Sequence, residues 1–268
     1  MFLIAFRKLA IISILAQLLG SKISLATPYL DYQIIGSYPH NISHFTQGLE
    51  LSNGIIYEST GGYGKSKLLA YSLTDSRVKM QHKLSRRHFG EGLTILDNHI
   101  FQLTWKSGKV YRYQQQNFKP AGRLAIEGEG WGLTSNGEHL IYSNGSANLY
   151  FISPVDGQLL KTLHITESDD SVQEINELEW VDGLIYANIW HSDDIVIINP
   201  DSGQLVGRID LSGLLPKALR RWDTGVLNGI AYDSTTKQLI VTGKNWPVLY
   251  EIQLDPTGDS IRPPAAKN

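Results

Sequence analysis

A carboxylate, a lysine and several tryptophans occupy corresponding positions in repeated stretches of this sequence. The carboxylate belongs to Glu91, which lies between two glycines in the stretch FGEGLTILDNHIFQLTW. Glycine on both sides allows a close approach of backbone that a larger side chain would prevent. Tryptophan rings around one carboxylate would form a box for a small cationic group, through charge attraction and cation–π contacts. The candidate functional residues are Gln47, Glu91, Trp105, Trp131, Asn176, Trp190 and Lys244.

Five stretches share the frame in which these residues lie. They read FTQGLELSNGIIYES, FGEGLTILDNHIFQL, GWGLTSNGEHLIYSN, INELEWVDGLIYANIW and LNGIAYDSTTKQLIVTG. In each stretch a short turn rich in Asn, Asp or Gly separates two runs of strand-forming residues, and a third such run follows. Three of the copies also show a fourth run. A shared aliphatic residue recurs at intervals of 44, 40, 45 and 52 residues, at Leu49, Leu93, Leu133, Leu178 and Ile230.

Repeated units of about 40–45 residues, each built from short strands, are typical of a β-propeller. The five copies therefore predict an all-β, five-bladed propeller that forms a single domain. The segment from Tyr29 to Pro39 is left over before the first copy, and the fifth copy ends at YEIQL without a fourth strand. We expect the N-terminal strand to complete the last blade, which would close the ring and remove an open sheet edge.

The first strand of each blade lines the central channel of a propeller. The position two residues before each shared aliphatic residue is expected to face this channel, and glycines around it would let the inner strands approach the axis. A tryptophan or a lysine follows the second strand in three copies. An alternative is that these side chains only fill the channel and hydrogen-bond to one another. The first set is Gln47, Glu91, Trp131, Asn176 and Asn228, and the second is Trp105, Trp190 and Lys244.

The composition excludes several functional classes. The chain has 268 residues and a formal net charge of −2, so a polyanionic partner such as nucleic acid is not expected. It contains no cysteine, which rules out disulfides, thiolate metal sites and a cysteine nucleophile. No G-x-S-x-G stretch occurs, so the nucleophile elbow of the α/β-hydrolases is absent.

Two short motifs suggest chemistry that their context does not support. GYGKS at Gly62–Ser66 resembles the end of a phosphate-binding loop, but Ser59 stands where the earlier glycine is required and a strand-like run follows. WHSDDI offers His191, Asp193 and Asp194 as metal ligands. No second histidine lies at ligand spacing, so a solvated loop is favoured there.

The N-terminus has the features of a secretory signal peptide. Arg7 and Lys8 precede an apolar run over 9–19, and small residues at Ser24 and Ala26 form a cleavage frame. The run is too short to span a bilayer comfortably. We therefore predict a periplasmic or secreted protein with no membrane attachment after cleavage, and an uncleaved anchor is the alternative. The predicted organisation is a signal peptide over 1–26, the propeller over 27–256 and a flexible tail over 257–268.

Eight motifs, taken in order, resemble those of the plant-type glutaminyl-peptide cyclotransferases, the glutaminyl cyclases of plants and bacteria. They are FTQGLE, YESTGGYGKS, FGEGLT, QLTWK, GWGLTSNG, INELEWVDGLIYANIW, VLNGIAYD and VTGKNWPVLYEI, and the resemblance runs from about Tyr32 to Leu254. It implies a five-bladed propeller that needs no catalytic zinc and no other cofactor. By motif position it implies an active site made of Glu91, Trp105, Trp131, Asn176, Trp190 and Lys244, with Gln47 as a further member.

The resemblance also implies a defined reaction. Enzymes of this family cyclise an N-terminal glutamine: the α-amine attacks the side-chain amide, ammonia leaves and pyroglutamate remains. Glu91 would act as general acid and base, while Lys244 and Asn176 would hold the amide and the developing oxyanion. The substrate is a peptide or protein with N-terminal glutamine, and a monomeric enzyme is expected. The substrate-binding residues would be Gln47, Trp105, Trp131 and Trp190.

Two other functions stay open at this point. A non-enzymatic exported propeller could bind a partner peptide through the same mouth of the channel. A metal-dependent propeller lactonase or lyase would need a ring of Asp, Asn and His around the axis. The predicted inner ring contains neither His nor Asp.

Overall fold

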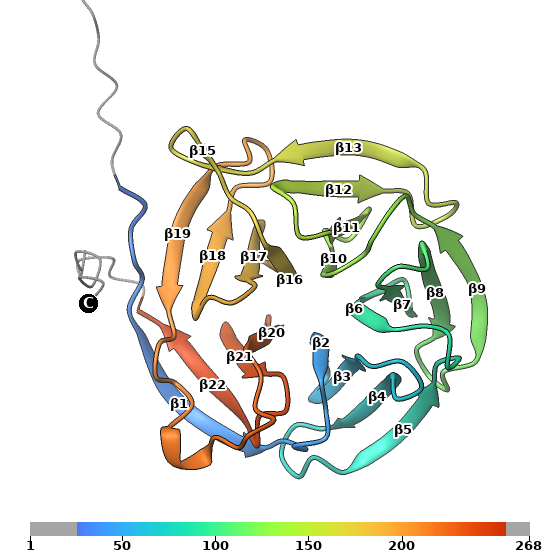
Figure 1. The fold of residues 1–268 in the computed structure, drawn as a ribbon, viewed down its shortest axis with the longest axis horizontal. Helices are drawn as coiled ribbons and strands as arrows, with labels where there is room; N and C mark the ends of the chain where they lie inside the picture. Colours follow the sequence, from blue (N-terminus) through green and yellow to red (C-terminus); the bar gives the residue numbers. More distant parts are fainter. Residues whose placement is uncertain (1–25, 256–268) are drawn as a thin grey trace, which may run out of the picture.

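Five antiparallel sheets surround a central axis, like the blades of a propeller (Figure 1). The structure is a computed structural model, and it describes residues 26–255. Each sheet has four strands, and the strand that comes first in the repeat frame lies nearest the axis. The prediction of an all-β, five-bladed propeller is confirmed.

The first three blades follow the chain in simple order. Blade 1 contains β2 (Thr46–Ser52), β3 (Ile55–Thr60), β4 (Lys67–Ser72) and β5 (Val78–Lys83). Blade 2 contains β6 (Gly90–Leu96), β7 (His99–Thr104), β8 (Lys109–Gln114) and β9 (Pro120–Ala125). Blade 3 contains β10 (Leu133–Ser135), β11 (Leu140–Ser143), β12 (Asn148–Ile152) and β13 (Leu159–His164).

Blade 4 also follows the chain in order, whereas blade 5 takes its outer strand from the N-terminal part of the described chain. Blade 4 contains β16 (Ile175–Val181), β17 (Leu184–Ile189), β18 (Asp194–Ile198) and β19 (Leu205–Asp210). Blade 5 contains β20 (Leu227–Asp233), β21 (Gln238–Gly243) and β22 (Val248–Leu254), and its outer strand is β1 (Tyr32–Pro39). β1 pairs antiparallel with β22, from Tyr32 opposite Leu254 to Pro39 opposite Val248. The predicted closure of the last blade by the N-terminal strand is thus confirmed.

The hydrophobic core lies between neighbouring blades. Residues on the inner strands alternate between the two faces of a sheet, and each face packs against the next blade. For example, Ile141 of blade 3 belongs to one buried cluster with Leu178 and Ile185 of blade 4. The outer strands β5 and β13 are largely exposed. The packed inner strands therefore form a rigid support for whatever lies at their ends.

Glycines at the inner strands permit this close packing. A Cβ atom at Gly48, Gly92 or Gly132 would lie within 3.0 Å of backbone atoms of the next blade. The Gly92 amide also donates to the Trp131 carbonyl at 2.6 Å. Only glycine fits these positions, which explains the residue that follows Glu91.

Three features go beyond the sequence prediction. Blade 2 has a fourth strand, β9, which begins at Pro120 on the outer edge of the sheet, where a missing amide donor is tolerated. A small hairpin of β14 (Thr166–Glu167) and β15 (Asp170–Ser171) connects blades 3 and 4. The stretch LLPKALRRWD contains a single 3₁₀ turn, η1 (Lys217–Leu219), which the repeat frame does not include.

The predicted signal peptide, apart from its last residue, and the predicted tail lie outside the described residues. Within residues 26–255, no helix has the length and apolar character needed to cross a membrane.

Candidate active site

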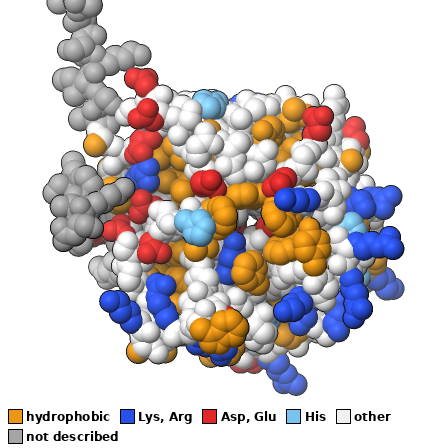
Figure 2. Space-filling model, in the orientation of Figure 1, with side chains coloured by type: hydrophobic (Ala, Val, Ile, Leu, Met, Phe, Trp, Pro, Cys, Tyr) orange, Lys and Arg blue, Asp and Glu red, His pale blue; other side chains and the backbone are white. Residues whose placement is uncertain are grey.

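A cavity of about 420 Å³ opens at one mouth of the central channel, and we call it the mouth cavity. On the face shown in Figure 2, hydrophobic side chains gather around the central hollow, and acidic and basic side chains lie beside them. All seven candidate residues from the sequence line this cavity: Gln47, Glu91, Trp105, Trp131, Asn176, Trp190 and Lys244. Five other residues also line it: Phe45, Phe89, His191, Gly225 and Val226.

β-bulges lie at the mouth end of four inner strands. The pairing of β2 with β3 shifts between Thr46 and Gly48, and the pairing of β6 with β7 shifts between Gly90 and Leu93. Corresponding shifts occur in β16 and β20. A bulge leaves residues without a cross-strand partner and re-aims their side chains. The bulged residues include Gln47, Glu91, Asn176 and Asn228.

The second strand of each blade supplies the rest of the cavity wall. It runs antiparallel to the first strand, so its end lies beside the start of its neighbour. Gly90 pairs with Thr104, for example, which brings Trp105 to the mouth. The same geometry places Trp190 after β17 and Lys244 after β21. Residues far apart in the chain therefore converge because each blade repeats one strand pairing.

Glu91 is the buried acid of the cavity, with 4% of its surface exposed. Burial raises the pKa of its carboxyl well above the ordinary value, because the charged form loses its hydration. The Lys244 ammonium and the Gln47 amide act in the opposite direction, and Glu129 adds to the rise. The carboxyl therefore keeps its proton to a higher pH than an exposed glutamate does.

Lys244 is the buried base of the cavity, with 6% of its surface exposed. Burial lowers its pKa to about 8, against the opposing charge of Glu91. Its ammonium lies 5.2 Å from the centre of the Phe45 ring, a cation–π arrangement. Two backbone hydrogen bonds fix the lysine: its amide donates to Val226, and its carbonyl accepts from Gly225.

The aromatic walls are interlocked edge to face. Trp131 and Trp190 lie 5.5 Å apart, and Trp105 lies 5.6 Å from Phe89, measured between ring centres. The Glu129 carboxylate accepts a hydrogen bond from the Trp105 indole at 2.7 Å and from the Trp131 indole at 3.2 Å. Glu129 therefore holds two of the walls in place, although no repeat or motif of the sequence marks it.

Two of the missed wall residues carry a signal in the sequence. Phe45 and Phe89 each stand two residues before a predicted site residue, in the matching stretches HFTQG and HFGEG. The same frame that gave Gln47 and Glu91 could have given both phenylalanines. His191 and Val226 lie in connecting segments, where no strand period predicts the direction of a side chain.

Buried polar atoms around the mouth differ in whether they are satisfied. The Gln47 Oε1 atom is buried and has no hydrogen-bond partner among the described residues, so a bound molecule could donate to it. Asn228, which the repeat frame placed in the inner ring, does not line the cavity. Its side chain donates to the Thr46 carbonyl at 3.0 Å, which ties blade 5 to blade 1.

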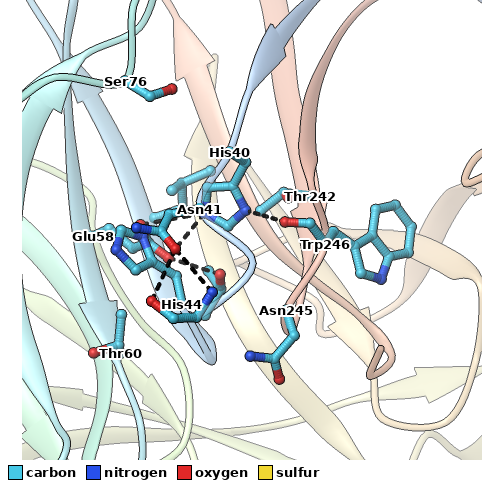
Figure 3. A network of polar contacts seen from close by, with 12 residues as sticks. His40, Asn41, His44, Glu58, Thr60, Ser76, Thr242, Asn245 and Trp246 are labelled. Carbon is cyan, nitrogen blue, oxygen red and sulfur yellow. Dashed lines mark hydrogen bonds and ion pairs between the residues drawn. The ribbon is translucent and has the colours of Figure 1, made fainter. Parts of the chain in front are cut away.

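Within residues 26–255, one group of three residues has the composition of a metal site: His40, His44 and Glu58 (Figure 3). Their candidate ligand atoms lie within 4.8 Å of one another. The Glu58 carboxylate already lies within hydrogen-bonding distance of both imidazoles, and it accepts from the hydroxyls of Thr46 and Tyr71. None of the three residues lines the mouth cavity.

This His–Glu cluster connects two blades. His40 also donates from Nδ1 to the Trp246 carbonyl at 2.8 Å. It therefore connects Glu58 of blade 1 to the residues that follow β21 in blade 5. Burial alone would raise the pKa of Glu58, but His44 and His40 outweigh it and hold that pKa below its usual range. His191, Asp193 and Asp194, where the sequence favoured a loop over a metal site, form no second such group among residues 26–255, and Asp194 pairs with Arg208 at 3.0 Å.

Comparison with known proteins agrees with the resemblance in the motifs. The family model described as glutamine cyclotransferase matches residues 8–254. The glutaminyl-peptide cyclotransferase of Arabidopsis thaliana is 36% identical over 239 residues, which cover 88% of this chain and 75% of that protein. The crystal structure of the Myxococcus xanthus glutaminyl cyclase superposes with a TM-score of 0.79 at 35% identity, and the match covers 85% of this chain and 98% of that one. The chain therefore belongs to the glutamine cyclotransferase family, the plant and bacterial type of glutaminyl cyclase.

Proposed function

We propose that this protein converts the N-terminal glutamine of peptides and proteins to pyroglutamate with release of ammonia. The observation that carries the proposal is the buried Glu91 carboxyl, with Lys244 and three tryptophans around it in one cavity. The family relationship supports the same reaction, because both relatives named above are glutaminyl cyclases.

The substrate carries its own nucleophile, so the protein needs neither a serine nor a cysteine for attack. The α-amine of glutamine attacks the side-chain amide carbon, a C–N bond forms, and the amide nitrogen later leaves as ammonia. An α-amine has a pKa near 7.7–8.0, so its deprotonation at pH 7 costs only about 1 kcal/mol. Walls formed by Trp105, Trp131 and Trp190 would hold the side chain folded back on the amine, which supplies proximity.

Glu91 would move the proton that this reaction requires. Its carboxylate accepts the proton from the attacking amine and, as a carboxylic acid, delivers it to the leaving nitrogen. A raised pKa favours the second proton transfer, because the Glu91 carboxyl then stays protonated at higher pH and can deliver its proton to the leaving nitrogen. Proton transfer of this kind contributes about 10²–10⁴ in rate.

The polar groups of the cavity would bind the two ends of the reacting glutamine. Lys244 and Asn176 stabilise the oxyanion that develops on the amide oxygen. The unpartnered Oε1 atom of Gln47 accepts a hydrogen bond from the substrate amine. No step needs a metal ion or another cofactor.

The deciding experiment measures ammonia release from a short Gln-initiated peptide. With Glu91→Gln, the rate should fall by about 10²–10⁴ while the circular dichroism spectrum and the melting temperature stay unchanged or rise. Exposed Glu138 offers the control Glu138→Gln, which should keep full activity. Undiminished turnover by the Glu91 variant would remove this residue from the mechanism.

Two further measurements separate this reaction from a metal-dependent activity and from a non-enzymatic binding protein. EDTA should leave the rate unchanged, and loss of activity in EDTA would move the chemistry to a bound ion. Peptide binding by the wild-type protein without any ammonia release would favour the binding scaffold instead.

We also propose that the protein acts as a monomer outside the cytoplasm. The basis for export is the predicted signal peptide over 1–26. Cell fractionation and N-terminal sequencing of the mature chain test this, with Thr27 as the expected first residue.

A further inference from the structure

A second hollow, of about 630 Å³, lies directly beside the mouth cavity. The two share Phe45 and Phe89 as a common wall. The new hollow is bordered by the segment between β3 and β4, which contains the GYGKS stretch, by the end of β5, and by the loop at Trp222. We call it the basic hollow, because its charged lining residues include Lys65, Lys67 and Lys83.

The positive charge of this hollow is not balanced by the fold. Lys65, Lys67 and Lys83 form no ion pair with any residue in the part of the chain that the structure describes. Asp223 is the carboxylate among the lining residues, and it is already paired with Arg221 at 3.0 Å. The lining therefore presents a net positive charge to anything that enters.

Two of these lysines are placed against each other. Lys67 on β4 and Lys83 on β5 are direct cross-strand partners. Like charges at directly opposite positions destabilise a sheet. An anionic group bound in the hollow would relieve this repulsion, and no carboxylate among the described residues does so.

Aromatic side chains flank the hollow at its surface. Trp222 lines it and is 93% exposed. Tyr63 is 54% exposed and packs edge to face against the shared wall residue Phe89, with ring centres 5.5 Å apart. Exposed aromatic rings beside a cationic lining suit a peptide whose apolar side-chain atoms pack on the rings while its acidic side chains face the lysines.

We propose that the basic hollow binds acidic side chains of the substrate, at the second to fourth positions after the N-terminal glutamine. This inference rests on the proposed function, in which the glutamine itself occupies the mouth cavity. An extended chain advances about 3.3–3.6 Å per residue, so three residues reach about 10 Å beyond the reacting end. The protein is thereby selective for peptides with Asp or Glu near the N-terminus.

The test compares three peptides that differ only in charge: Gln-Ala-Glu-Glu-Ala, Gln-Ala-Ala-Ala-Ala and Gln-Ala-Lys-Lys-Ala. For the wild-type protein at low salt, kcat/KM for the acidic peptide should exceed that for the neutral one by about fivefold to thirtyfold, as expected for several exposed ion pairs. The basic peptide should be the poorest substrate. The preference should shrink at 0.5 M NaCl, because salt screens exposed charges.

The combined variant Lys65→Ala, Lys67→Ala and Lys83→Ala should lose this preference while its rate with the neutral peptide stays unchanged. Lys119→Ala, in an exposed turn of blade 2, is the matched control and should keep the preference. Equal kcat/KM for acidic and neutral peptides in the wild type, or an undiminished preference in the triple variant, would overturn the proposal. Failure of the proposed function looks different, because then none of the three peptides releases ammonia.

Discussion

At the scale of single residues, Glu91 and Lys244 have pKa values that burial moves toward each other. Burial raises the pKa of the acid and lowers the pKa of the lysine to about 8. Each charge stabilises the other, because their mutual attraction opposes the effect of burial on both. The charge state of the cavity therefore depends on both groups together.

Lys244→Arg is expected to change the alkaline limb of the pH profile. The lysine loses its positive charge as the pH rises through about 8, so wild-type kcat/KM should fall above that pH. Arginine stays charged there, so the variant should keep part of its activity and lose the falling limb. Rates of ammonia release between pH 6 and 10 give the comparison. An unchanged alkaline limb in the variant would assign the titration to another group.

The sequence predicted where these side chains lie because the fold repeats. Glu91 and Gln47 occupy one position of the frame, and a β-bulge at that position turns each side chain toward the mouth. Glu129 could not be predicted in this way, because it lies in a connection between blades. Its role depends on reaching Trp105 and Trp131 in space, which no local pattern encodes.

At the scale of strands and blades, carboxylates of inner strands accept hydrogen bonds from the backbone of other blades. Glu50 of β2 accepts from the Ile95 amide of β6 at 3.0 Å. Glu177 of β16 accepts from Leu49 and Ile230, and so joins three blades across the axis. Burial raises the pKa of both carboxyls. Glu177 accepts with both of its oxygens, which a neutral amide with a single acceptor oxygen could not do.

Glu50→Gln is expected to flatten the dependence of stability on pH. Burial raises the pKa of Glu50 from 4.5 to about 7 in the folded protein. The folded state therefore binds this proton more tightly, and the stabilisation is present below about pH 4.5 and lost as the pH rises to 7. Glutamine mimics the protonated acid at every pH, so the variant should be the more stable of the two at pH 8. Urea unfolding at pH 5 and pH 8 gives the free energy of unfolding of both proteins. An equal change in this free energy between the two pH values would contradict the prediction.

His40→Ala is expected to weaken the joint between blades 5 and 1. The change removes the donor to Trp246 and leaves the Glu58 charge buried with fewer partners. Breaking one side of a buried pair costs about 3–5 kcal/mol. The free energy of unfolding in urea should fall by that amount, and His99→Ala at the start of β7, where the imidazole hydrogen-bonds to the Asp97 carbonyl, should change it little. Activity of the folded fraction should persist, since the His–Glu cluster does not line the mouth cavity.

The strands missed by the sequence prediction share a physical reason. β9 begins with a proline and is exposed along most of its length, so it lacks the alternation that marks a half-buried strand. β14 and β15 have two residues each and carry no period at all. The inner strands, in contrast, combine apolar residues with turn signals and were predictable.

At the scale of the whole molecule, one pairing of the chain ends closes the ring. Without β1, the backbone of β22 would present an unpaired edge to solvent. A chain that starts at His40 should lose about 5 kcal/mol or more of stability, which corresponds to roughly 10–20 °C in melting temperature. It should also self-associate in analytical ultracentrifugation. Removal of residues 256–268 is the control. If the chain that starts at His40 had the same melting temperature as the complete chain, β1 would not stabilise the closed ring.

The same pairing imposes an order on the synthesis and folding of the protein. Tyr32 is among the first described residues to leave the ribosome, and its partner Leu254 is among the last. Blades 1 to 4 can assemble while translation continues, but the final blade must wait for the complete chain. Until then the apolar side chains of Ile34 and Ile35, which are exposed even in the finished propeller, lie on a strand with no partner. A nascent chain that stalls before β22 cannot close its ring. Its strand β1 then stays unpaired and can form a sheet with another chain.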